Sequence, residues 1–216
     1  MPERDLALVV DGSRRDEPLV LLVDSSGAME PPEPGEIPQP ELINALRRLG
    51  PSQRDRIGRV VAVSGPGSYM GVRGGLAAGL GTAQALGCGL ALVGTLEVVG
   101  AGADPDQERV LALADAGRGG TFGQVLEACR GRWRASARPE LLARDAPWPR
   151  HWTELEHCLG RAGEGRQAPA GVIWLGETRD RRQALAWIVL GDPAPLASYD
   201  LVRAEYATPV EGQQWS

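Results

Sequence analysis

The same short pattern occurs twice in this sequence, once near the start and once just past the middle. Leu6–Arg14 and Leu111–Arg118 both begin with an apolar run, reach an aspartate (Asp11 or Asp115), and end in small residues and an arginine. A repeated unit of this kind predicts two related lobes rather than one continuous sheet. A chance likeness between two strand-plus-turn segments is the alternative.

Each copy is followed by a second apolar run, which predicts a β-hairpin. These second runs are Pro18–Val23, reached through the charged loop Arg14–Glu17, and Thr121–Ala128. The proline-rich stretch 31–40 predicts a loop that leads into the first helix. Periodicity and turn residues predict helices over Glu41–Leu49, Trp152–Arg161 and Arg179–Leu190, and strands over Ile57–Val63, Leu90–Gly94 and Gly171–Leu175.

The length fits a two-lobed chain, and the composition indicates a globular protein of a reducing compartment. The stretch Gly100–Asp106 is typical of a linker, so the 216 residues are expected to form lobes at 1–103 and 104–216. The three cysteines are widely spaced, and the first apolar run is too short for a signal peptide, so we expect a cytoplasmic protein. The uncharged stretch Gly74–Leu96 is too rich in glycine to favour a membrane span.

The charges exclude several kinds of chemistry. The net charge of −5 argues against a dedicated nucleic-acid surface. Every basic residue is an arginine, which excludes Schiff-base chemistry and a phosphate-loop lysine.

The segment Val60–Leu86 carries the most information. A strand runs into the turn Gly65-Pro66-Gly67-Ser68, and a helix follows, with Ser68 as its expected N-cap. Glycines at such a turn either present backbone N–H groups to an anion or simply permit a tight turn. Their spacing matches neither established phosphate-binding fingerprint, so both interpretations stay open.

The predicted helix after this turn contains an unusual number of glycines. Each is about 1 kcal/mol less favourable than alanine in a helix interior, so a compensating contact is expected. One apolar stripe should face the sheet, formed by Val72, Leu76, Leu80 and Ala83. A second stripe of Gly71, Gly75 and Gly79 would let another helix approach closely. That helix is either the one expected over Glu41–Leu49 or one of another protein.

The sequence from Gly65 to Val99 resembles the signature of the TsaB family, also called YeaZ. Members typically read GPGS-aromatic-x-G-x-R, followed by a small-residue helix, a strand and Ser-Leu-Glu, where this chain has Thr95-Leu96-Glu97. Four weaker likenesses lie outside this stretch. Asp11-Gly12-Ser13 resembles the family's opening Asp-Thr-Ser, and Asp115–Phe122 resembles its Asp-Ala-Arg-x-Gly-Glu-Val-Tyr. Gly171–Gly176 resembles a late strand that ends in glycine, and Tyr199–Arg203 resembles a near-terminal Tyr-Leu-Arg. The chain departs from the family at Gly12 and Met70, where threonine is usual, and at Pro38–Glu41, where His-Ser-Glu is usual.

This resemblance implies an α/β, two-lobed ASKHA-type (actin-like/RNase H-like) fold with duplicated βββαβα lobes. It implies a non-catalytic partner that binds a TsaD-like transferase in threonylcarbamoylation of the tRNA adenosine next to the anticodon. A TsaE-like ATPase joins the complex, so ATP and metal are expected on the partners, and tRNA contact only indirectly. A homodimer is a further possibility. The implied interface is helical, with candidate residues Gly65, Gly67, Ser68, Tyr69, Gly71, Arg73, Gly75 and Gly79.

The alternatives are an ASKHA-fold, kinase-like enzyme, a diverged dimeric paralogue and a generic binding module. A kinase-like site would use Asp11, Ser13 and Asp115 for nucleotide phosphates, although strand-end carboxylates that bind loop N–H groups explain the same residues. Trp174 lies between Gly171 and Gly176 and suits a buried strand better than an adenosine loop. No catalytic residue or metal ligand is predicted. Four arginines alternate along a predicted strand and could contact phosphates or face solvent: Arg130, Arg132, Arg134 and Arg138.

Overall fold

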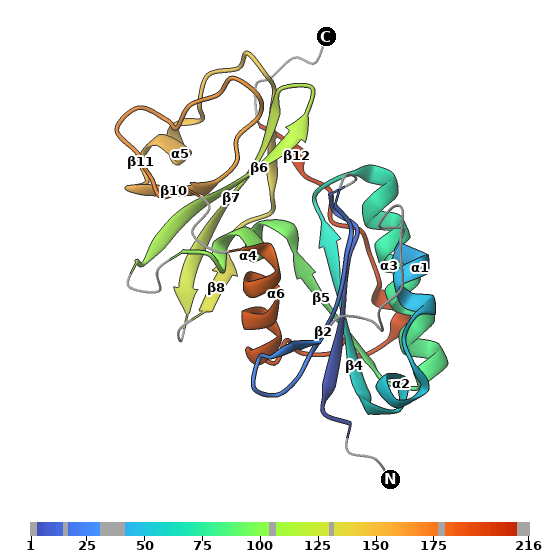
Figure 1. The fold of residues 1–216 in the computed structure, drawn as a ribbon. Helices are drawn as coiled ribbons and strands as arrows, with labels where there is room; N and C mark the ends of the chain where they lie inside the picture. Colours follow the sequence, from blue (N-terminus) through green and yellow to red (C-terminus); the bar gives the residue numbers. More distant parts are fainter. Residues whose placement is uncertain are drawn as a thin grey trace. The chain divides into compact units, whose positions relative to one another are not determined.

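The chain forms two compact units, each built on its own sheet (Figure 1). The computed structural model describes residues 4–14, 17–30, 42–103, 107–129, 132–176 and 180–210. The predicted proline loop 31–40, the predicted helix start at Glu41, residues 104–106 of the predicted linker, Arg130 and Arg179 lie outside these ranges. Unit 1 comprises Met1–Gly94 with Leu185–Glu205, and unit 2 comprises Thr95–Ala184 with Tyr206–Ser216.

This division differs from the predicted lobes 1–103 and 104–216 in two places. Helix α4 (Thr95–Gly100) belongs to unit 2, because Leu96 packs into the same core as Val110 and Leu126. The segment Leu185–Glu205 returns to unit 1. Both differences come from contacts between distant residues, which a compositional boundary does not register.

Unit 1 has a five-stranded sheet with the order β3-β2-β1-β4-β5. The strands are β1 (Leu6–Asp11), β2 (Leu19–Val23), β3 (Met29–Glu30), β4 (Ile57–Gly65) and β5 (Gly89–Gly94). β1 and β2 form the predicted antiparallel hairpin, whereas β4 runs parallel to both β1 and β5. The parallel arrangement requires a crossover between β4 and β5, which is a helix.

The helices of unit 1 are α1 (Leu42–Arg47), α2 (Pro51–Arg56) and the crossover helix α3 (Tyr69–Leu86). The predicted cap is confirmed, since the Ser68 hydroxyl accepts a hydrogen bond from the Gly71 N–H at 3.4 Å. α3 ends at Gly87, which adopts the left-handed conformation that favours glycine. The apolar stripe predicted for this helix joins the core of the sheet, with Leu80 only partly buried.

A C-terminal strap, residues 192–205, completes unit 1. Its backbone and side chains bind the first 94 residues: the Leu196 N–H donates to the Leu90 carbonyl at 2.8 Å, and the Tyr199 hydroxyl donates to the Cys88 carbonyl at 2.5 Å. Helix α6 (Arg181–Leu190) precedes the strap, which contains the short helix η1 (Tyr199–Leu201). The strap therefore covers one edge of β5.

Unit 2 repeats the topology of unit 1. Its sheet has the order β11-β10-β6-β7-β9-β12, with β8 paired to β7. The strands are β6 (Arg109–Gly117), β7 (Gly120–Cys129), β8 (Arg132–Ala135), β9 (Glu140–Leu142), β10 (His157–Gly160), β11 (Ile173–Trp174) and β12 (Thr208–Pro209). Strands β9, β7, β6, β10 and β11 have the order and relative directions of β3, β2, β1, β4 and β5. The predicted duplication and the ASKHA-type fold are confirmed.

The helix predicted over Trp152–Arg161 is wrong. The chain forms the single turn α5 (Arg150–Thr153) and then enters β10, which pairs in parallel with Leu111–Leu113 of β6. This central pairing outweighs the local helical spacing. Trp152 is fully buried, its ring lies against Gly123 of β7, and its indole N–H donates to Glu140 Oε2 at 3.1 Å. Trp152 thus packs into the core of unit 2 together with Leu155, Ala162 and Val172.

No helix within the described ranges is both long enough and apolar enough to cross a membrane.

Candidate functional site

The glycine stripe of α3 packs inside the chain. An ideal Cβ at Gly71 would lie 2.1 Å from the Gly12 carbonyl oxygen, and one at Gly75 would lie 3.0 Å from the Gly12 nitrogen. At Gly79 it would lie 3.1 Å from the Cβ of Ala62 on β4. The stripe's partner is therefore the chain's own sheet and not either of the two helices considered. These three glycines do not offer an interface.

The turn before α3 is also occupied from within. Gly65 has a φ of +109°, and a Cβ there would lie 2.7 Å from the Glu205 carbonyl oxygen of the strap. A Cβ at Gly67 would lie 2.5 Å from the Ser13 carbonyl oxygen, which accepts a hydrogen bond from the Ser68 N–H at 2.8 Å. Gly65, Gly67 and Ser68 thus shape the turn and the helix start.

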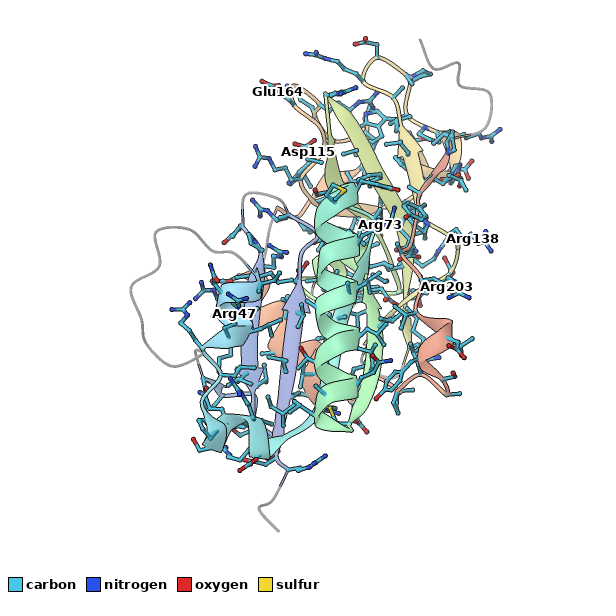
Figure 2. The ribbon with its side chains drawn as sticks, turned by 90° about the vertical axis from the view of Figure 1, so that its right-hand side faces the viewer. Arg47, Arg73, Asp115, Arg138, Glu164 and Arg203 are labelled. Atoms are coloured by element: carbon cyan, nitrogen blue, oxygen red, sulfur yellow. The ribbon has the colours of Figure 1, made fainter. Side chains whose placement is uncertain are left out.

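Two of the predicted interface residues, Tyr69 and Arg73, are exposed. The Arg73 guanidinium lies 5.1 Å from the centre of the Tyr69 ring and donates to its hydroxyl. Figure 2 looks onto this side of α3 and shows Arg73 on it. The pair stands at the first turns of the helix, where both side chains can meet another molecule.

A different small-residue stripe faces outward, and we call it the outer α3 face: Met70, Gly74, Ala77 and Gly81. Met70 is 75% exposed, and the neighbouring helix α1 adds Ile43, which is 60% exposed. Ideal Cβ atoms at Gly74 and Gly81 would have no atom of the described residues within 4 Å. Each glycine therefore weakens the helix by about 1 kcal/mol without any packing gain inside the chain. Sequence analysis missed this face, although the glycine spacing of seven was available as a signal.

The two aspartates of the repeat have the same local role. Asp11 Oδ1 accepts the Ser13 N–H at 2.8 Å, and Asp115 Oδ1 accepts the Gly117 N–H at 2.8 Å. Asp11 is buried and Asp115 is exposed. The Asp11 carboxylate holds the turn that follows β1, and the Asp115 carboxylate binds Gly117, the last residue of β6. Both bind a local backbone N–H, as the interpretation without a ligand expects.

The chain's own backbone lies close beside the glycine of the first aspartate turn, whereas the glycine of the second, Gly117, faces open space. In unit 1, an ideal Cβ at Gly12 would lie 2.2 Å from the Gly71 carbonyl oxygen. In unit 2, one at Gly163 would lie 2.3 Å from the Gly119 carbonyl oxygen, and the Gly163 N–H donates to Thr121 Oγ1 at 2.9 Å. Within the described ranges, no group of three His, Cys, Asp or Glu residues could hold a metal ion. The turn after Asp11 therefore has no room for a phosphate beside Gly12.

The structure also shows the surroundings of Trp174 and of the arginines predicted to alternate along a strand. Trp174 is 38% exposed on β11, so the prediction that it lies in a buried strand is wrong. Arg132 and Arg134 are exposed on β8 with the buried Trp133 between them, and Arg138 follows the strand. Charged side chains on an outer strand protect it from unwanted pairing, which explains the arginines of β8 without a ligand.

Comparison with solved structures decides the fold. YeaZ from Pseudomonas aeruginosa superposes with a TM-score of 0.59 and 22% sequence identity, over 95% of this chain and 99% of that chain. This protein has the YeaZ fold. A second structure, of an uncharacterized protein with similarity to peptidase YeaZ from Pseudomonas aeruginosa, gives a TM-score of 0.58 and 19% identity, over 97% of this chain and 100% of that chain.

Sequence comparison adds a match over part of the chain to the TsaD family, the expected partner of a YeaZ-type protein. Residues 39–137 match the TsaD family, tRNA N6-adenosine threonylcarbamoyltransferase. No curated protein sequence is significantly similar to this chain. The matched stretch contains α3 and most of the YeaZ-like signature, and it contains neither of the chain's two histidines, His151 and His157.

Proposed function

We propose that this chain is a TsaB-type protein that binds a TsaD-like transferase and takes part in threonylcarbamoylation of the tRNA adenosine next to the anticodon. The YeaZ fold, the partial TsaD match and the signature at Gly65–Arg73 support this role. The observation that carries the proposal is the outer α3 face, whose two glycines have no packing contact with the described residues that would explain them.

The chemistry of this surface fits a helical partner. Gly74, Ala77 and Gly81 keep the outer α3 face low, so the backbone of a second helix can approach closely. Met70 and Ile43 supply apolar side chains that lose contact with water when a partner covers them. Tyr69 and Arg73 stand beside them, and Tyr, Met and Arg are enriched in the cores of protein interfaces.

The same geometry supports a non-catalytic role. Backbone fills the space beside Gly12 in the first aspartate turn, and we assign ATP, metal and the main contact with tRNA to the partner proteins. The chain contains no lysine and only two histidines, which further limits general acid–base chemistry. The competing partner for this face is a second copy of the chain, which would form a homodimer.

Substitutions on the outer α3 face test this proposal. Met70→Glu places a charge in the contact, and Gly74→Leu blocks the close approach of a helix. Each substitution should therefore raise the Kd for a purified TsaD-like transferase of the same organism at least tenfold. Ile173→Glu is the matched control, because it adds the same charge at a residue 52% exposed on β11. Binding is measured by calorimetry, and light scattering reports any homodimer.

If Met70→Glu and Gly74→Leu bind as tightly as the Ile173→Glu control, the outer α3 face is not the contact. If the wild-type chain does not bind the transferase at all, the function itself is wrong. Dimerisation that only the two α3 substitutions abolish would assign the face to a second copy.

A further inference from the structure

Two residues other than glycine have left-handed backbone within the described ranges: Arg118 and Asp192, each with a φ of 51°. Aspartate tolerates this conformation better than most residues. Asp192 also gains an ion pair with Arg59, so its conformation has a compensating contact. Arg118 has neither advantage, so its left-handed backbone conformation needs another explanation.

Arg118 and Gly119 are the two central residues of the turn that joins β6 to β7, since Gly117 pairs with Gly120. The φ angles of 51° and 79° place both residues in the left-handed region, as a type I′ turn requires. Asn-Gly is the preferred sequence for such a turn, because asparagine accepts this conformation more readily than arginine. The exposed Arg118 side chain makes no hydrogen bond or ion pair with the described residues. No side-chain bond to the described residues therefore offsets its strain.

A second guanidinium is held against the same turn. The side chain of Arg144 crosses Gly119 so closely that an ideal Cβ there would lie 2.6 Å from its Cγ and 2.9 Å from its Nε. Arg166 fixes the loop that carries Arg144, because its Nε donates to the Arg144 carbonyl at 3.1 Å and its Nη2 donates to the Ala143 carbonyl at 2.9 Å. The Arg166 guanidinium also stacks on Trp148 at 4.6 Å. These contacts hold the loop that carries Arg144 in place beside the turn that carries Arg118.

The surrounding charges narrow the class of ligand. Asp115 and Glu164 are exposed on the same unit, where Figure 2 labels both, and Asp145 follows Arg144 directly in the chain. These carboxylates would repel the continuous negative charge of a nucleic acid. A mixed patch of this kind is typical of protein interfaces, in which single charges of opposite sign meet. A carboxylate is the group that an arginine guanidinium binds with a strong, charge-assisted hydrogen bond.

We propose that Arg118, assisted by Arg144, binds a carboxylate on the surface of the transferase partner, so that the β6–β7 turn is a second contact besides the outer α3 face. This proposal rests on the proposed function and adds to it a residue for partner recognition in unit 2. The strain at Arg118 is then offset in the complex rather than in the free chain.

The substitution Arg118→Asn separates strain from recognition. Asparagine suits the turn, so the melting temperature of the free chain should rise by about 2–4 °C. The affinity for the purified TsaD-like transferase should fall about tenfold, and the difference from wild type should shrink as salt is added. Arg118→Gly should behave in the same way. Arg138→Asn is the matched control, because it removes an exposed arginine of the same unit that has ordinary backbone.

Opposite changes in stability and affinity would support the inference. It is overturned if Arg118→Asn binds the transferase as tightly as Arg138→Asn, or if the melting temperature falls, which would give Arg118 a structural role within the chain. Loss of binding by Met70→Glu together with unchanged binding by Arg118→Asn would overturn this inference and leave the proposed function standing. Failure of the wild-type chain to bind the transferase would overturn both.

Discussion

Replacing Gly75 by leucine should destabilise unit 1 by about 3 kcal/mol, because the new side chain has no space between α3 and the end of β1. A Cβ alone at this position would already lie 3.0 Å from the Gly12 nitrogen and 3.4 Å from the Gly12 Cα. These are backbone atoms of the central strand and its turn, so they cannot rotate away as a flexible side chain can. Urea denaturation followed by circular dichroism measures the effect.

The adjacent glycine provides a matched control. Gly74→Leu adds the same side chain to the same helix at a position with no atom of the described residues within 4 Å, so it should raise the free energy of unfolding by about 0.5–1 kcal/mol. Equal stabilities of the two variants would contradict the packing of α3 described above. A stable Gly75→Leu variant that loses only partner binding would return the inner stripe to the interface.

Trp152→Ala should lower the free energy of unfolding by about 3–5 kcal/mol, the range for truncating a fully buried tryptophan. The ring lies against Gly123, where an ideal Cβ would be 2.2 Å from the nearest ring atom, so its removal leaves a cavity beside β7. Glu140 also loses the hydrogen bond from the indole N–H. Chemical denaturation of the purified variant measures the change.

Trp174→Ala is the control for this effect, since Trp174 is 38% exposed and should change the free energy of unfolding by less than about 1 kcal/mol. Similar losses for the two variants would show that Trp152 does not hold the core of unit 2. A loss confined to Trp152→Ala would support a central place for Trp152 in the core of unit 2.

Local signals were sufficient for the central elements of both sheets. The β1–β2 hairpin follows from two apolar runs separated by turn residues, and α3 follows from the cap at Ser68 and the stop at Gly87. The duplication was visible because an apolar run leads to Asp11 and to Asp115. In the structure, each carboxylate accepts the N–H of the second residue after it. In these cases the residues that specify an element lie within or next to it.

Contacts between distant residues account for what the sequence did not predict. His157–Gly160 becomes a strand because β6, more than forty residues earlier in the chain, offers a parallel partner. The strap binds strands that lie about a hundred residues before it, as Tyr199 does at Cys88. Spacing on α3 showed which glycines share a side of the helix but not which side meets the sheet. The candidate site therefore moved from Gly75 and Gly79 to Gly74 and Gly81.

The most direct test of the account is to mix the purified chain with the purified TsaD-like transferase of the same organism. Size-exclusion chromatography with light scattering would detect the complex, and an assay with the TsaE-like ATPase and tRNA would measure threonylcarbamoylation with and without this chain. If the proposed function is right, we expect a stable heteromeric complex and tRNA modification that depends on adding the chain. A transferase that forms no complex with the chain and is fully active without it would contradict the account.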